Sequence, residues 1–240
     1  MIFTPNIKCK NGVNKNILQQ PFPLGTKVKG VFTGLSVEIY CPTSIKTIYD
    51  NGFYGKGSKS RGAPRIVTKE KMTVNNECLT LELEESGFLA YFLGVLSICD
   101  FEDQEIQWTE FAHAAKSLYP NYLENLAAYM YLKSKGWIIK SGIKFGGNFL
   151  IYKNGPRFNH ASFIIIVFPT SKGQCNITTR DLKGMQRIAE TSDKDILLLE
   201  ITKSNAFAFN TLFDLNQFRV SETVIRRFNS TSFVQTNKLK

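Results

Sequence analysis

The chain has 240 residues, 43% of them hydrophobic and 12% aromatic, enough for one large or two small folded domains with a real core. No apolar run approaches the roughly 20 residues that a membrane-spanning helix needs, and the first 23 residues do not read as a secretory signal. Five scattered cysteines without a Cys-x-x-Cys pair argue against a disulfide scaffold or a zinc site and favour a reducing compartment, the cytosol or the nucleus.

The formal net charge of +10 is unevenly distributed along the chain. Residues 1–66 carry a net +8, residues 67–136 a net −6, and residues 137–240 a net +8. Two basic segments around an acidic one favour one surface that binds a polyanion and another that binds a protein partner. Charge that serves only solubility gives the same pattern.

The first part of the chain predicts short elements and a basic loop. Apolar residues interrupted by Gly30 and Gly34 predict short strands within 24–50, and residues 43–49 can form a short helix. The glycine-rich basic loop at 54–65 is too rich in glycine for a stable helix. Such a loop either contacts phosphate or serves as a flexible linker.

Three helices are predicted in the middle of the chain. Phe88, Tyr91, Phe92 and Val95 recur at helical spacing and predict a buried helix over 79–98. Further helices are predicted over 109–118 and from Pro120 to Gly136. His113 lies on the second of these, where a packed or half-exposed side chain is more common than a catalytic one.

The pattern changes at Trp137. Strands are predicted near 137–141, 148–153, 160–168, 196–201 and 220–228, with one helix over 178–190. The fold class is therefore α+β with an α/β unit. We divide the chain into an N-terminal mixed α/β domain, 1–134, with short strands and helices, and a compact C-terminal α/β domain, 135–240, with a central mixed sheet.

The sequence excludes the common nuclease and nucleotide motifs. Metal-dependent nucleases cluster carboxylates around Mg²⁺, but residues 137–240 hold only seven acidic residues. The nearest acidic-x-Lys pattern, Glu200 to Lys203, has one residue too many. A P-loop, a dinucleotide fingerprint and a nucleophile elbow are absent. We therefore expect no metal and no cofactor.

A tyrosine and a histidine flank a Pro/Gly turn. Tyr152 lies on a predicted strand, and His160 stands eight positions later, ahead of an apolar run. Metal-free RNA cleavage needs a base for the 2′-hydroxyl, an acid for the leaving 5′-oxygen and a cation for the phosphorane. Tyr152, His160 and Lys194 can fill these roles, provided that cations lower the tyrosine pKa. Taken singly, each residue is more often structural.

Three runs of this part of the chain resemble the catalytic domain of tRNA-splicing endonucleases: Tyr131-Leu-Lys-Ser-Lys-Gly-Trp137, Gly142-Ile-Lys-Phe-Gly146 and Leu150-Ile-Tyr152-Lys-x-Gly-Pro156-x-Phe158-x-His160-Ala-Ser-Phe163. The resemblance is greatest to the eukaryotic subunit assigned to the 5′ splice site. More loosely, it covers most of residues 54–230, including Ser192-Asp-Lys194 before the strand at 196–201.

The resemblance implies a catalytic triad and a set of RNA-binding residues. Tyr152 matches the general base, His160 the general acid and Lys194 the residue that stabilises the transition state. The implied products are a 2′,3′-cyclic phosphate and a 5′-hydroxyl, formed without metal. Arg187 and Phe228 match the pair that sandwiches a bulged base, where relatives often carry Trp in place of Phe228, and the neighbouring Arg227 is assigned to RNA binding. Asn148 departs from the usual Asp outside the triad.

The resemblance also implies partners and a location. The substrate would be a precursor tRNA, cut at the 5′ splice site, and the chain would work in a heterotetramer of endonuclease subunits, with the strand near Ile225 as a pairing edge. We expect the nucleus, with the cytoplasm as the other compartment, and no membrane. The alternative is a non-catalytic structural or RNA-binding subunit of the same complex. The intact set of Tyr152, His160 and Lys194 argues against that alternative.

Overall fold

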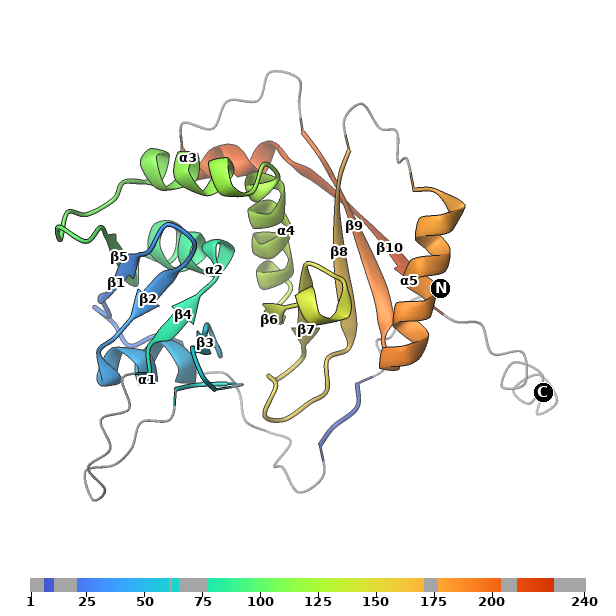
Figure 1. Ribbon diagram of the computed structural model, residues 1–240, viewed down its shortest axis with the longest axis horizontal. Helices are drawn as coiled ribbons and strands as arrows, with labels where there is room; N and C mark the ends of the chain where they lie inside the picture. Colours follow the sequence, from blue (N-terminus) through green and yellow to red (C-terminus); the bar gives the residue numbers. More distant parts are fainter. Residues whose placement is uncertain are drawn as a thin grey trace.

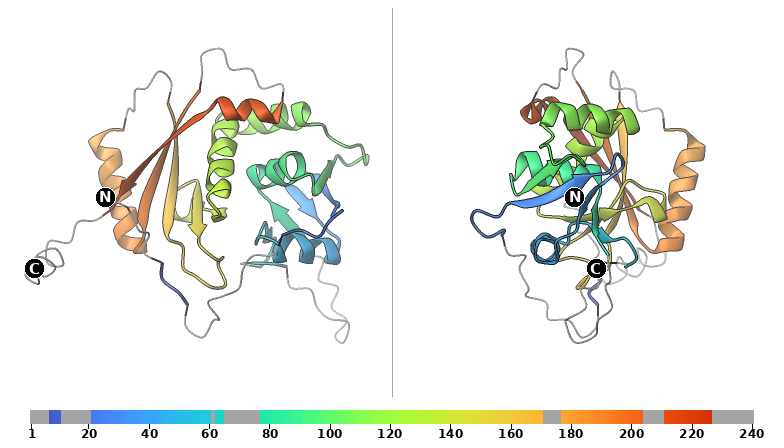
Figure 2. Two further views of the ribbon diagram at one scale, coloured as in Figure 1. Left: turned by 180° about the vertical axis from the view of Figure 1, so that it is seen from behind. Right: turned by 60° about the vertical axis from the view of Figure 1, so that its left-hand side comes forward.

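The computed structural model describes residues 7–10, 21–60, 62–64, 77–170, 177–203 and 211–226. These residues form two five-stranded mixed sheets, with helix α4 between them and helix α5 on the far side of the second sheet (Figures 1 and 2). No helix in the described ranges is long and apolar enough to cross a membrane.

The first sheet has the strand order β3-β4-β2-β1-β5, in which β1 and β5 are parallel and the other neighbours antiparallel. Its strands are β1 (Val28–Phe32), β2 (Val37–Ile39), β3 (Lys56–Gly57), β4 (Leu79–Leu81) and β5 (Leu96–Cys99). The helices of this half are α1 (Pro42–Asp50), α2 (Leu83–Gly87) and α3 (Trp108–Leu118).

The second sheet has the order β10-β9-β8-β7-β6, in which β8 and β9 are parallel. Its strands are β6 (Ile138–Ser141), β7 (Phe149–Tyr152), β8 (Phe163–Thr170), β9 (Asp195–Thr202) and β10 (Arg219–Ile225). Helices α4 (Tyr122–Ser134) and α5 (Thr179–Ser192) cover its two faces, and short 3₁₀ turns lie at Ile143–Phe145 and Leu212–Gln217.

Strand β8 is buried on both faces. Successive side chains point to opposite sides of a strand, so they pack into two different apolar clusters. Ile165 and Val167 join the core that includes α4, whereas Ile164 and Ile166 pack toward α5. This explains the uninterrupted apolar run of the strand. The presence of both parallel and antiparallel pairs confirms the predicted mixed sheet in the C-terminal part of the chain.

One core connects the two sheets. Leu126, Tyr129 and Leu132 of α4 are almost fully buried and belong to a cluster that reaches from β1 to β9. Burial of one such side chain contributes about 1.5–3 kcal/mol. Because α4 packs on helices α2 and α3 of the first half and on strands β6, β8 and β9 of the second sheet, it belongs structurally to neither half alone. The division at residues 134 and 135 stays a prediction.

The predicted helix over 79–98 is wrong at both ends. Only Leu83–Gly87 is α-helical, and a π-helical turn continues it over Phe88–Phe92. Leu79–Leu81 and Leu96–Cys99 are strands instead, because each pairs with a strand from earlier in the chain. Short apolar runs fit both periods, and pairing partners that are distant in sequence decided between them. The predicted helices at 109–118 and 178–190 and the one after Pro120 are confirmed.

A half-buried lysine holds the start of the basic loop against the second sheet. Lys140 of β6 donates hydrogen bonds of 2.6 Å to the carbonyls of Phe53 and Gly55 and lies 3.7 Å from a carboxylate oxygen of Glu85. The backbone N–H of Gly55 donates to the same Glu85 carboxylate. Glu77 holds the loop further along by accepting the backbone N–H of Ser60. The described part of 54–65 is therefore anchored, and Arg61 and Arg65 lie outside the described residues.

Candidate active site

The strand register gathers Tyr152, His160 and Lys194 at one end of the second sheet. Strand β7 ends at Tyr152 and runs antiparallel to β8, so its last residue lies beside the start of β8. Strands β8 and β9 are parallel, and their first residues, Phe163 and Asp195, are paired directly. His160 precedes Phe163 by three positions, and Lys194 precedes Asp195 by one. The order β7-β8-β9 therefore brings the three segments together.

A tight turn joins Tyr152 to His160. Gly155 has φ +110°, which favours glycine, and an added Cβ would lie 2.5 Å from the Phe53 ring. The backbone N–H groups of Phe158 and Asn159 both donate to the Gly155 carbonyl. The Pro/Gly turn seen in the sequence is thus also a contact between the two halves of the molecule.

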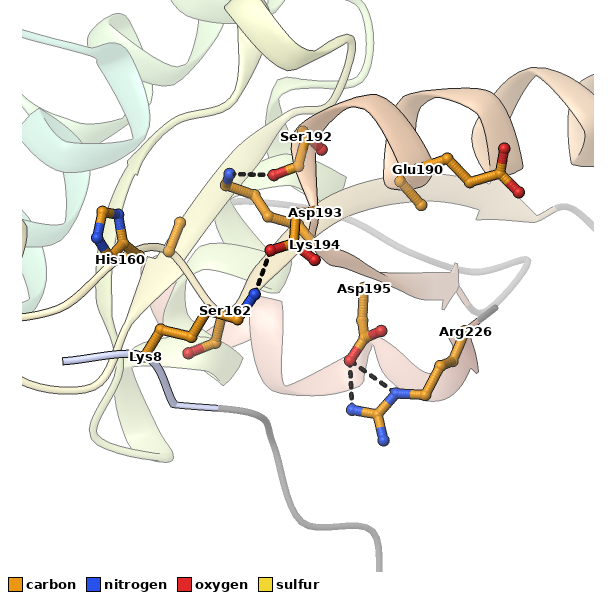
Figure 3. Close-up of a pocket in the computed structure, with 11 residues that line it drawn as sticks. Lys8, His160, Ser162, Glu190, Ser192, Asp193, Lys194, Asp195 and Arg226 are labelled. Carbon is orange, nitrogen blue, oxygen red and sulfur yellow. Dashed lines mark hydrogen bonds and ion pairs between the residues drawn. The ribbon is translucent and has the colours of Figure 1, made fainter. Parts of the chain in front are cut away.

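An open pocket of about 560 Å³ holds two residues of the predicted triad, His160 and Lys194. His160 is exposed, whereas Lys194 is half-buried. Figure 3 shows both on one side of the pocket, with the ion pair of Asp195 and Arg226 on the other. Lys194 follows the end of α5, where Asp193 adopts a left-handed conformation, and its ammonium donates to the Ser192 carbonyl over 2.7 Å.

Tyr152 lines a neighbouring cavity of about 520 Å³ rather than the pocket itself. Phe145 connects the two spaces, since it lines the Tyr152 cavity and its ring centre lies 4.9 Å from the Lys194 ammonium. Ala161 lines the pocket and packs in the same small apolar cluster as Tyr152. The predicted triad is therefore divided between two neighbouring cavities, with His160 and Lys194 in one and Tyr152 in the other.

Burial governs the electrostatics of the tyrosine and the lysine. Burial raises the pKa of Tyr152 above its ordinary value, so in the free chain its phenol is neutral near pH 7. The condition that cations lower this pKa is not met in the structure. Burial lowers the pKa of Lys194, an effect that Asp193 opposes and Lys8 reinforces.

The three predicted RNA-binding residues are only partly covered by the structure. Arg187 lies exposed on α5 and does not line the pocket. Phe228 and Arg227 lie outside the described residues, directly after Arg226. A sandwich around a bulged base therefore stays a prediction.

Sequence reasoning missed Lys8. This residue reaches the pocket from the short segment 7–10 and forms an ion pair with Asp193, the neighbour of Lys194 (Figure 3). No local sequence pattern around Lys8 predicts this position, because its partner Asp193 is 185 residues away in the chain. Within the described ranges, no group of three or more His, Cys, Asp or Glu side chains could hold a metal ion.

Comparison with protein families gives one match at the site. Residues 122–206 match the family described as tRNA intron endonuclease, catalytic C-terminal domain. The matched range contains Tyr152, His160, Arg187 and Lys194.

Relatives named as a tRNA-splicing endonuclease or as a subunit of one include proteins from animals, fission yeast and archaea. The rat tRNA-splicing endonuclease subunit Sen2 is 31% identical over 163 residues, which are 65% of this chain and 35% of that protein. The chicken Sen2 subunit is 28% identical over 72% of this chain and 40% of its own. The tRNA-splicing endonuclease of Pyrobaculum arsenaticum is 28% identical over 74% of this chain and 92% of its own. The aligned region thus spans well under half of the animal proteins but nearly all of the archaeal one.

Proposed function

This chain belongs to the tRNA-splicing endonuclease family, and we propose that it is a catalytic subunit that cuts intron-containing precursor tRNA at the 5′ splice site without a metal ion. The observation that carries the proposal is the common position of Tyr152, His160 and Lys194 at one end of three adjacent strands.

In the proposed reaction the RNA supplies its own nucleophile. Tyr152 takes the proton of the 2′-hydroxyl at the junction, and the 2′-oxygen attacks the adjacent phosphorus. The bond from phosphorus to the 5′-oxygen breaks, and His160 gives a proton to that oxygen. Lys194 stabilises the negative charge that builds up on the phosphorane oxygens between these events. The products are a 2′,3′-cyclic phosphate and a 5′-hydroxyl.

The neutral phenol of Tyr152 sets a condition on this reaction. A phenol with a raised pKa is a strong base once ionised, but only a small fraction is ionised near neutral pH. The reactive form therefore pairs an ionised Tyr152 with a protonated His160, and it is a minor population of the free chain.

The RNA-binding part of the proposal concerns the bulged nucleotides at the junction. Attack in line with the leaving oxygen needs a flexible sugar–phosphate, which a stacked A-form helix does not provide. Arg187 and Phe228 would hold the bulged base between flat groups, with Arg227 beside them. We further propose a heterotetramer with other endonuclease subunits and residence in the nucleus, which tagging of the chain in cells would test.

The alternative is a non-catalytic structural or RNA-binding subunit of the same complex. Such a subunit would tolerate changes to His160, because its contribution would be binding and assembly. The archaeal relative is named as the endonuclease itself rather than as a subunit, so the isolated chain and the assembled complex both have to be assayed.

The test is cleavage of an intron-containing precursor tRNA by the isolated chain and by the complex purified with its partners. With wild-type chain we expect the complex to cut both junctions, and with His160→Ala to lose the 5′ cut and keep the 3′ cut. His113→Ala, a change to the other histidine in the sequence, is the matched control. Undiminished 5′ cleavage by the His160→Ala complex would support the non-catalytic alternative, and loss of the 3′ cut instead would reassign the splice site.

A further inference from the structure

We propose that Lys8 is a phosphate-binding residue of the same site, carried into the pocket by the short segment 7–10. The inference rests on the proposed RNA cleavage, since a phosphate contact there requires RNA in the pocket. It adds a second cation to the three residues that the family resemblance supplies.

Backbone pairing fixes segment 7–10 beside His160. The N–H of His160 donates to the Lys8 carbonyl over 3.0 Å, and the N–H of Lys10 donates to the Phe158 carbonyl over 2.9 Å. Cys9 and Asn159 form the bridge between these bonds. Asn159 is only 2% exposed, and its amide donates to the Cys9 sulfur. The place of Lys8 is therefore set by main-chain bonds and does not depend on its side chain.

The Lys8 side chain is held in the pocket by a weak partner. Its ammonium pairs with Asp193 (Figure 3), and the two side chains are 47% and 83% exposed. Exposed ion pairs contribute at most about 1 kcal/mol, so a phosphate oxygen can replace Asp193 at small cost. Lys10, on the same segment, instead donates to the Pro156 carbonyl over 2.6 Å.

The charge of the pocket explains why a second cation is needed. Besides His160, the lining contains the cations Lys8, Lys194 and Arg226 and the carboxylates Glu190, Asp193 and Asp195. The formal balance is zero with Lys8 and −1 without it, so a pocket without Lys8 would repel a phosphate.

The reaction itself adds to this need. The Arg226 guanidinium is already bound to Asp195, with Nε 2.9 Å from the carboxylate. The phosphorane in the transition state carries about two negative charges, and Lys194 supplies one positive charge. Lys8 supplies another from a position that is fixed beside the acid, His160. Preorganised cations of this kind are worth more in a transition state than in the bound substrate.

The experiment uses the full chain assembled with its partner subunits and an intron-containing precursor tRNA. Single-turnover rates of 5′ cleavage, and the dependence of binding on salt, are measured for Lys8→Ala, Lys8→Arg and the matched control Lys10→Ala. We expect Lys8→Ala to slow cleavage about 10- to 100-fold and to reduce the salt slope of binding by about one. Lys8→Arg should retain most activity, and Lys10→Ala should change neither quantity.

Two results would overturn the proposal. One is a Lys8→Ala complex with a cleavage rate within about twofold of wild type and an unchanged salt slope. The other is an equal loss for Lys8→Ala and Lys10→Ala that Lys8→Arg does not restore, which would show that segment 7–10 only supports the His160 loop. His160→Ala is assayed in the same series. If His160→Ala is inactive while Lys8→Ala is unaffected, only the role of Lys8 falls, whereas full 5′ activity of His160→Ala removes the proposed function as well.

Discussion

The Lys194 ammonium lies 4.9 Å from the centre of the Phe145 ring. Lys194 lines the pocket that contains His160, and Phe145 lines the cavity that contains Tyr152. A cation over an aromatic face is stabilised by about 0.5–2 kcal/mol, depending on its solvation. Phe145 therefore helps to hold the Lys194 ammonium in place, although it transfers no proton itself.

Replacing Phe145 by Leu should slow cleavage without preventing RNA binding. Loss of the ring contact releases the Lys194 ammonium, and we expect the single-turnover rate of 5′ cleavage to fall about 3- to 30-fold. Phe145→Tyr keeps the aromatic face and should stay within about twofold of wild type. Equal rates for the Leu and Tyr variants would contradict a role for the ring.

The raised pKa of Tyr152 gives the cleavage rate a specific pH dependence. Below the raised pKa of Tyr152, each pH unit gives tenfold more phenolate. In the His160→Ala complex, which lacks the proposed acid, the residual single-turnover rate of cleavage should therefore rise about tenfold per pH unit between about pH 8 and 9.5. A residual rate that stays flat or falls over this range would show that Tyr152 is not the base.

The buried contact between Lys140 and Glu85 should stabilise the joint between the two sheets. Lys140→Met removes the ion-pair partner of the Glu85 carboxylate, which is only 5% exposed, and loses two hydrogen bonds to the loop. Removing one partner of a buried pair costs about 3–5 kcal/mol. Urea unfolding should show a loss of this size, whereas the exposed Lys144→Ala should change the free energy of unfolding by less than about 0.5 kcal/mol. A Lys140→Met loss as small as that of the control would mean that water or relaxation compensates the pair.

Stability should depend on pH through Glu82. Burial, together with the carboxylate of Glu85, raises the pKa of Glu82 from 4.5 to about 7. Between these values the folded chain holds a proton that the unfolded chain has lost, so stability falls as the pH rises through this window. Glu82→Gln should therefore be more stable than wild type at pH 8 and lose that advantage near pH 4.5. Urea midpoints at both pH values test this, with the exposed Glu102→Gln as control; equal shifts at the two pH values would refute it.

Arg187 is expected to act on binding rather than on chemistry. Its guanidinium is exposed on α5, about two helical turns before Lys194. Loss of a stacking contact to a bulged base costs about 1–3 kcal/mol, so Arg187→Ala should weaken precursor tRNA binding by this amount and leave the cleaved ends unchanged. Arg180→Ala removes the same charge from the start of the helix. Equal weakening by both changes would indicate general attraction to phosphate instead of stacking.

The parts of the fold that the sequence predicts well are those with a single consistent period. The run from Ile164 to Val167 is apolar on both faces because α4 and α5 cover both, and it reads directly as a buried strand. Leu79 to Cys99 misleads, because its apolar spacing fits a helix while its ends pair with strands some 40 and 70 residues earlier. Local periodicity does not encode such pairing.

The candidate site also has parts that the sequence predicts and parts that it does not. Tyr152 and His160 lie on either side of one turn, and the motif around that turn suggested both. The sequence does not predict the role of Lys8, because its position depends on backbone pairing with residues about 150 positions later. The residues next to Lys8 do not encode that pairing. The neutral state of Tyr152 is likewise a consequence of packing, since burial alone raises its pKa.

The most direct test of the proposed cleavage chemistry is the identity of the cut ends. The assembled complex is incubated with precursor tRNA in excess EDTA, and the ends at the 5′ junction are analysed, with a substrate carrying a 2′-deoxy sugar at that junction as control. We predict a 2′,3′-cyclic phosphate and a 5′-hydroxyl from the normal substrate and no cut in the 2′-deoxy substrate. A 3′-hydroxyl paired with a 5′-phosphate, or cleavage of the 2′-deoxy junction, would contradict attack by the 2′-hydroxyl.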